Sequence, residues 1–127
     1  MNVWRWGVVA AGLALPTMAM ACGACDEDTV AATYDHPVAQ RAITRGQVLV
    51  FASIEGIGDA KALANRAGSA ARRVAGVDRA SVRVSAAPLA LSFAIDPKMQ
   101  TVEGAIVDVQ HRGHDQDIRL SVVRVVR

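Results

Sequence analysis

The sequence predicts an α+β domain in which helices cover an antiparallel sheet. Two observations lead to this prediction. Between residues 47 and 127, apolar residues follow strand-like patterns in four short segments and helical spacing in two others. These segments occur in the order strand, helix, strand, strand, helix, strand, which is the order of two split β-α-β units.

The first half of this region predicts a buried strand followed by a helix. Residues 47–54 form a β-branched and aromatic run between Gly46 and Gly56, which is typical of a buried strand. Asp59 is placed to cap a helix that ends at Gly76. The helix positions expected to face the core are Ala60, Leu63, Ala67, Ala70, Ala71 and Val74.

The second half predicts a hairpin, a helix and a last strand. Residues 81–85 and 89–95 alternate as strands on either side of a turn at 86–88, and the second of them has one core face. Thr101 is the expected N-cap of a helix that ends at Gly113, and residues 117–126 form the fourth strand. The buried stripe of this helix is expected to be Val102, Ala105, Ile106 and Val109.

These elements predict a ferredoxin-like βαββαβ sandwich, with both helices on one face of the sheet and the other face open. The expected exposed-face residues in the strands are Arg83, Ser85, Ser92, Arg119 and Arg124. Residues 22–46 form an N-terminal helical extension, with apolar residues at four-residue spacing and a break at Pro37. The extension either lies across the body or pairs with a second subunit.

Residues 1–21 have the pattern of a secretory signal peptide. Arg5 precedes a short apolar run that Pro16 interrupts, and Ala19-Met20-Ala21 supplies small residues at a cleavage site. The run is too short for a membrane-spanning helix. We therefore expect cleavage after Ala21 and a periplasmic or otherwise exported protein. A lipid anchor on Cys22 is the disfavoured alternative, because Ala19 occupies the position where lipoprotein signals usually have Leu.

The composition and motifs of the chain narrow the range of expected functions. The chain has 14 basic and 12 acidic side chains, and removal of Arg5 with the signal leaves these charges nearly balanced. A nucleic-acid partner would favour a basic face, so none is expected. No serine has a matched base and no phosphate-binding glycine loop is present. We expect a protein that is not an enzyme.

The candidate metal site lies at the start of the predicted mature chain. Cys22 and Cys25 are the only cysteines, and two thiolates at this spacing can chelate one soft cation such as Cu(I). After cleavage, the α-amine of Cys22 would add a further ligand. Asp26 and Glu27 lie nearby, and His36 is the imidazole closest in sequence. The expected metal ligands are therefore Cys22 and Cys25, together with His36 or an acid.

Other interpretations of the same residues remain open. In an oxidising compartment the two cysteines can form a short disulfide without a metal. A thioredoxin-like redox role is disfavoured because no strand precedes the cysteines and three acids follow them. His111 and His114, with Asp115 and Asp117, form a second polar cluster, which is interpreted as a solvated loop.

The region 47–127 resembles the heavy-metal-associated domain family. The resemblance lies in the order of elements and in the stretch Leu91-Ser92-Phe93-Ala94-Ile95-Asp96-Pro97, which looks like the third strand of that family. It implies a ferredoxin-like fold and soft-metal handling. The expected partner is a metal-trafficking protein or a second copy of the chain. The family's metal loop is here Ile54-Glu55-Gly56-Ile57-Gly58-Asp59, which has no cysteine, so no ligand carries over to it. The whole chain looks like a family of uncharacterised exported bacterial proteins.

Two functions are therefore expected from the sequence. The first is a periplasmic accessory protein that binds or delivers a soft metal through Cys22 and Cys25. The second is an interaction or self-association module whose cysteines are oxidised or lipidated and whose open sheet face binds a partner.

Overall fold

The computed structural model describes residues 21–113 and 118–127, with side chains described from residue 26 onward. The predicted signal peptide therefore lies outside the described residues, apart from Ala21. In chain order the elements are α1 (Ala21–Thr33), α2 (His36–Thr44), β1 (Val48–Gly56), α3 (Ala60–Ala71), the 3₁₀ helix η2 (Arg79–Ser81), β2 (Arg83–Ala86), β3 (Leu89–Ile95), α4 (Val102–Arg112) and β4 (Ile118–Val126).

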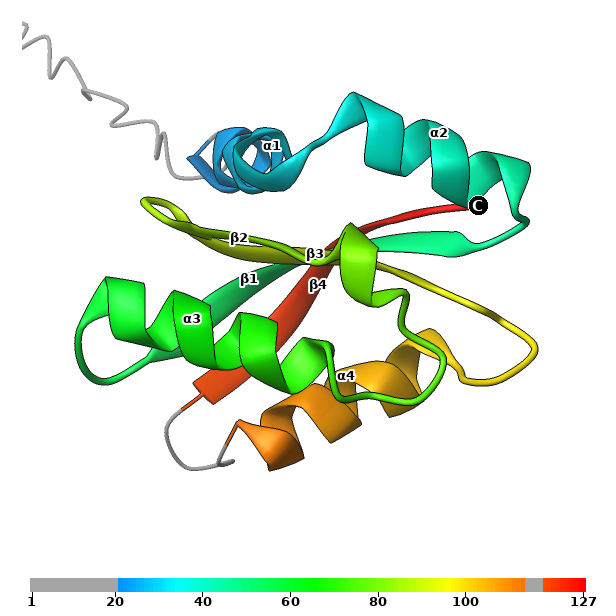
Figure 1. Cartoon of the computed structure of the whole chain (residues 1–127). Coiled ribbons are helices and arrows are strands. Elements are labelled where there is room, and N and C mark those ends of the chain that lie inside the picture. The colour runs from blue at the N-terminus through cyan, green and yellow to red at the C-terminus, as the bar shows by residue number, and fades with distance from the viewer. Residues whose placement is uncertain (1–20, 114–117) are drawn as a thin grey trace, which may run out of the picture.

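The four strands form one antiparallel sheet in the order β2-β3-β1-β4. The helices α3 and α4 each connect two strands that have a third strand between them, so both helices return across the same face (Figure 1). This arrangement confirms the predicted α+β class and antiparallel sheet. The caps predicted at Asp59 and Thr101 are also observed, with carboxylate and hydroxyl oxygens that accept main-chain N–H groups of Ala62 and Gly104.

The main core lies between the sheet and the α3–α4 layer. Alternate residues of the two central strands, Val50 and Ala52 in β1 and Leu91 and Phe93 in β3, are fully buried there. The helix stripes expected from the sequence face them, except that Ala60 at the start of α3 is only partly buried. The periodicity of these helices was therefore enough to predict which face they bury.

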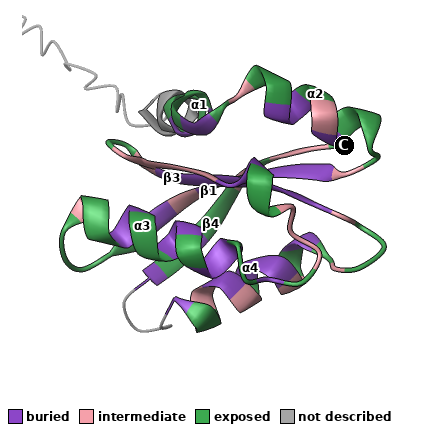
Figure 2. Ribbon diagram, in the orientation of Figure 1, coloured by how far each residue is buried: buried purple, intermediate pink, exposed green. Residues whose placement is uncertain are grey.

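The opposite face of the sheet is not open, and the prediction that it would be open is wrong. The helix α1 crosses this face and α2 packs beside it, so the sheet lies between two helical layers (Figure 1). Figure 2 shows buried residues on the sides of α1 and α2 that face the sheet. A second, smaller core forms there from Val30, Val38, Ala39, Ala42, Leu49, Phe51 and Ala94. Of the two arrangements expected for residues 22–46, the one that lies across the body is observed.

The small residues of β3 explain why this second layer fits. Ala90, Ser92 and Ala94 alternate with the larger core residues of the strand and present little bulk on the second face. All three are buried, and the hydroxyl of Ser92 donates to the main-chain oxygen of Thr33 at 3.3 Å. The alternation of large and small residues in β3 therefore separates two faces. The large residues face the main core, and α1 packs closely on the small ones.

Pro37 divides the N-terminal segment as expected. The helix α1 ends at Thr33, and Asp35 begins α2 as its N-cap, with Pro37 in the first turn. Within residues 21–113 and 118–127, no helix has the length and apolar character needed to cross a membrane.

Candidate functional site

The backbone of Cys22 and Cys25 lies in the first two turns of α1, while their side chains fall outside the described part of the chain. The next turn carries Asp26, Glu27 and Asp28, which are all exposed. The helix packs on the sheet from the next residue onward, since Thr29 and Val30 are buried. The two cysteine positions precede Thr29 by seven and four residues, which is the spacing of one helical stripe.

His36 lies beyond the other end of α1. It is exposed in the first turn of α2, and its Nδ1 is 3.2 Å from the hydroxyl oxygen of Tyr34. With a rise of about 1.5 Å per residue, position 25 is about 12 Å along the helix axis from Thr33. A site that combines Cys22, Cys25 and His36 therefore requires α1 to unwind.

The second sequence cluster is only partly within the structure. His111 is in the last turn of α4, whereas His114, Asp115 and Asp117 lie outside the described residues. Among the side chains that the structure describes, no group of three histidine, cysteine or acidic residues could hold a metal ion.

Asp35 joins the N-terminal helices to the edge of the sheet. Its Oδ1 accepts the main-chain N–H of Val38 at 3.2 Å, and its Oδ2 accepts the Nε of Arg83 in β2 at 3.1 Å. The Val38 N–H is the main cause that holds the pKa of Asp35 below its usual value, and the positive charges of Arg83 and Arg41 add to the effect. Arg83, expected to be exposed on an open face of the sheet, is instead part of this contact.

A second acidic residue makes a similar connection from the body to α2. Asp78 caps η2 through its Oδ1, while its buried Oδ2 lies 3.9 Å from Nε of Arg41 and 3.6 Å from Nη1 of Arg45. Nothing in the sequence spacing pairs residues 41 and 45 with residue 78. These contacts could be found only once the second layer was placed on the sheet.

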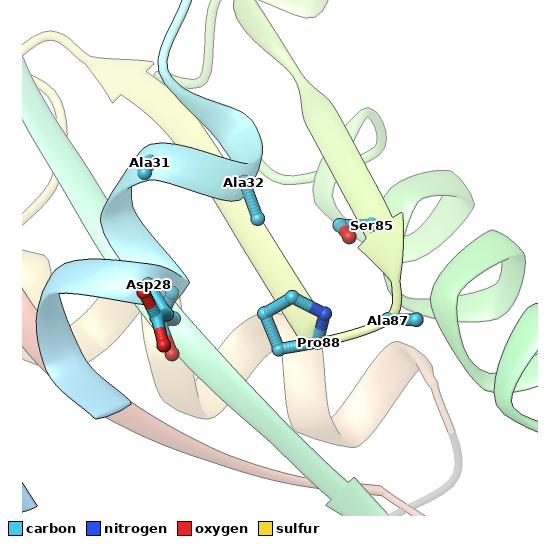
Figure 3. Close-up of a pocket in the computed structure, with 7 residues that line it drawn as sticks. Asp28, Ala31, Ala32, Ser85, Ala87 and Pro88 are labelled. Carbon is cyan, nitrogen blue, oxygen red and sulfur yellow. The ribbon is translucent and has the colours of Figure 1, made fainter. Parts of the chain in front are cut away.

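A groove lies between α1 and the β2–β3 hairpin. It encloses about 560 Å³ and is lined on one side by Asp28, Ala31 and Ala32, and on the other by Ser85, Ala87 and Pro88 (Figure 3). Thr29 completes the lining. These side chains provide one carboxylate and two hydroxyls on mainly apolar walls, with no histidine among them, so the lining offers no acid–base pair.

A cluster of arginines that was not expected from the sequence lies in the layer of α3 and α4. Ser69, Arg72 and Arg73 from the end of α3 and Arg79 from η2 surround a depression of about 340 Å³. Helical spacing brings the first three together, but only the fold brings Arg79 beside them.

Comparisons of this chain with protein-family models, with curated proteins and with solved structures give no match. The residues and the fold described above therefore carry the functional argument.

Proposed function

We propose that this protein is an exported, periplasmic accessory protein that binds a soft metal ion through Cys22 and Cys25, next to a ferredoxin-like body formed by residues 47–127. The observation that carries the proposal is the position of the two cysteines. They begin a helix whose second half packs on the sheet, and three exposed acids directly follow them. The strand order and the two β-α-β connections support the assignment of the body.

The packing of α1 gives the cysteine pair a fixed support. Val30 and Thr33 are buried against the sheet, and the main-chain oxygen of Thr33 accepts a hydrogen bond from Ser92. The first turns of α1 extend from this contact, so they can rearrange around a metal without loss of the core. Sulfur ligands favour Cu(I), and the charges of Asp26, Glu27 and Asp28 attract a cation.

The remaining ligands follow from the distances along α1. The α-amine of a mature Cys22 is on the same residue as one of the two sulfurs, whereas a helical α1 separates His36 from both cysteine positions. Two sulfurs and an amine near the start of the mature chain suit a metal that is passed to a metal-trafficking partner. Asp28, one of the three acids that follow the cysteines, also lines the groove between α1 and the β2–β3 hairpin.

Cu(I) titration of the reduced mature chain, residues 22–127, in competition with a chromogenic chelator, tests the proposal. We expect one Cu(I) per chain, and loss of this binding in Cys22→Ser/Cys25→Ser. His36→Ala is the matched control and should bind one Cu(I) with little change. Equal binding by the double serine variant, or a reduced chain that does not compete for Cu(I), would contradict the proposal.

Intact mass of the protein exported to its own compartment separates the states of the cysteines. A mass for residues 22–127 that gains two hydrogens on reduction identifies a reversible disulfide. A mass increased by a lipid identifies an anchored Cys22, whose sulfur is then no longer a free thiolate, and excludes the two-sulfur site.

An interaction module is the second candidate, and one feature of the sheet favours it. The nine-residue strand β4 is at the sheet edge and, among the described residues, pairs only with β1. Its outer main-chain groups can therefore pair with a second copy. Val122 of this strand is exposed. A self-associating protein would form a concentration-dependent dimer by sedimentation, with or without the cysteines, and Val122→Lys would weaken it. A strictly monomeric chain would exclude self-association.

A further inference from the structure

The depression at the end of α3 is surrounded by positive charge from two separate segments. Ser69 and Arg73 are four residues apart and Ser69 and Arg72 are three apart, so all three share one face of the helix. The chain keeps a helical turn past the end of α3. The N–H of Arg73 donates to the main-chain oxygen of Ala70 at 3.1 Å, and the N–H of Val74 donates to the main-chain oxygen of Ala71 at 3.2 Å. Arg79 faces the same depression from η2.

The carboxylate closest to this cluster in sequence is engaged elsewhere. Asp78 uses its Oδ1 to cap η2, and its Oδ2 faces Arg41 and Arg45 of the opposite layer. Within the described residues, no salt bridge joins Arg72, Arg73 or Arg79 to an acid. The arginines that contact Asp35 and Asp78 each have an acidic partner, in contrast to this cluster.

We propose that Ser69, Arg72, Arg73 and Arg79 form a binding site for a phosphate-type oxyanion. Guanidinium groups donate paired N–H bonds that match the geometry of such an anion, and the Ser69 hydroxyl adds another donor. The three positive charges repel one another when the site is empty, and an anion removes this repulsion. The C-terminal end of α3 carries about half a negative charge, which three full positive charges outweigh.

The size of the site indicates how the anion is bound. A depression of about 340 Å³ exceeds the volume of one phosphate, so it can hold a phosphate that is part of a larger molecule. Free phosphate and the phosphodiester headgroup of an anionic lipid share this chemistry. The site lies on the α3–α4 side of the protein, away from the cysteine positions in α1, so it does not depend on the proposed metal binding.

Isothermal titration with inorganic phosphate at low ionic strength tests the site, together with binding to phosphatidylglycerol vesicles against phosphatidylcholine vesicles. The test variant is Arg72→Gln/Arg73→Gln/Arg79→Gln. The matched control is Arg112→Gln/Arg119→Gln/Arg124→Gln, which removes the same charge from exposed arginines outside the site. We expect at least about tenfold weaker binding in the test variant and about twofold or less in the control.

Saturable binding of free phosphate that the test variant loses supports the site with a soluble ligand. Binding to phosphatidylglycerol vesicles alone, lost in the test variant and kept in the control, supports it with a lipid headgroup. Equal loss in both variants would show only the effect of net charge and overturn the proposal, as would no binding by the unaltered protein. Circular dichroism of each variant confirms that it is folded.

Discussion

The two faces of the sheet are covered in different ways. The face under α3 and α4 is packed by aliphatic side chains of six elements of the body and by Phe93. The face under α1 and α2 has a smaller core, in which three of the seven buried residues are alanines. Ion pairs also join the second layer to the body. They are Asp35–Arg83 and the pairs of Asp78 with Arg41 and Arg45.

This difference indicates how the two layers are stabilised. The first layer depends on apolar burial, which stabilises by about 25 cal/mol per Å² removed from water. The second layer buries less apolar surface and gains part of its specificity from charged contacts that fix its position. We expect the second layer to open before the first, which suits a segment that carries the proposed metal ligands.

The largest expected effect on the free energy of unfolding is at the two phenylalanines of the central strands. Phe93 faces the first core and Phe51 the second, and both are almost completely buried. We expect Phe93→Ala to lower the free energy of unfolding by about 5 kcal/mol and Phe51→Ala by about 3 kcal/mol, because α1 can move to fill part of the second cavity. Chemical denaturation of both variants measures the difference. A larger loss for Phe51→Ala would show that the second layer is the more rigid one.

A smaller effect is expected at the contact between α3 and β2. A Cβ added to Gly68 would lie 2.9 Å from Cγ1 of Val84, whose branched side chain can move little. Overpacking costs about 1–3 kcal/mol and the higher helix propensity of alanine returns about 1 kcal/mol, so Gly68→Ala should destabilise by about 1 kcal/mol. Thermal denaturation of Gly68→Ala, Val84→Ala and the double variant checks this. Strictly additive effects would show that the two residues do not compete for space.

The smallest expected effect is the pH-dependent contribution of Asp35, in the second layer, to the stability of the fold. The pKa of Asp35 is lowered from its usual 3.8, so its ionised form stabilises the folded protein above that pH, and this contribution is lost as the pH falls through the folded pKa. Asp35→Asn should therefore be less stable than the unaltered protein near neutral pH, with the difference shrinking in acid. Melting temperatures at neutral and acidic pH measure it. A difference independent of pH would contradict this role for the carboxylate.

Most of the body could be predicted from the sequence because each element carries its own signal. Asp59 and Thr101 cap the helices predicted for them, and the buried stripe of α4 consists of the expected residues. The second layer was the main error on the fold. The strand predicted from the alternation in β3 is confirmed. However, small residues on the second side of a strand suit both an open face and a closely packed helix. Only the position of α1 distinguishes these two cases.

The sites were less predictable because they depend on contacts between distant segments. Cys22 and Cys25 are recognisable from spacing alone, and their role stays a prediction. His36 was chosen for its closeness in sequence, but an intact α1 places it far from the cysteines. Arg79 carries no signal that relates it to Arg72 and Arg73, since the loop of residues 74–78 determines where it points.

The most direct test of the two-layer account is native-state hydrogen exchange of the mature chain. We predict that main-chain amides of α1 from Thr29 onward, and those of α2, exchange far more slowly than in an unfolded peptide, yet through openings of lower free energy than those of β1 and β3. Such a result would establish the N-terminal segment as a separate, weaker layer of the fold. Exchange of the α1 and α2 amides at unfolded-peptide rates would contradict the account.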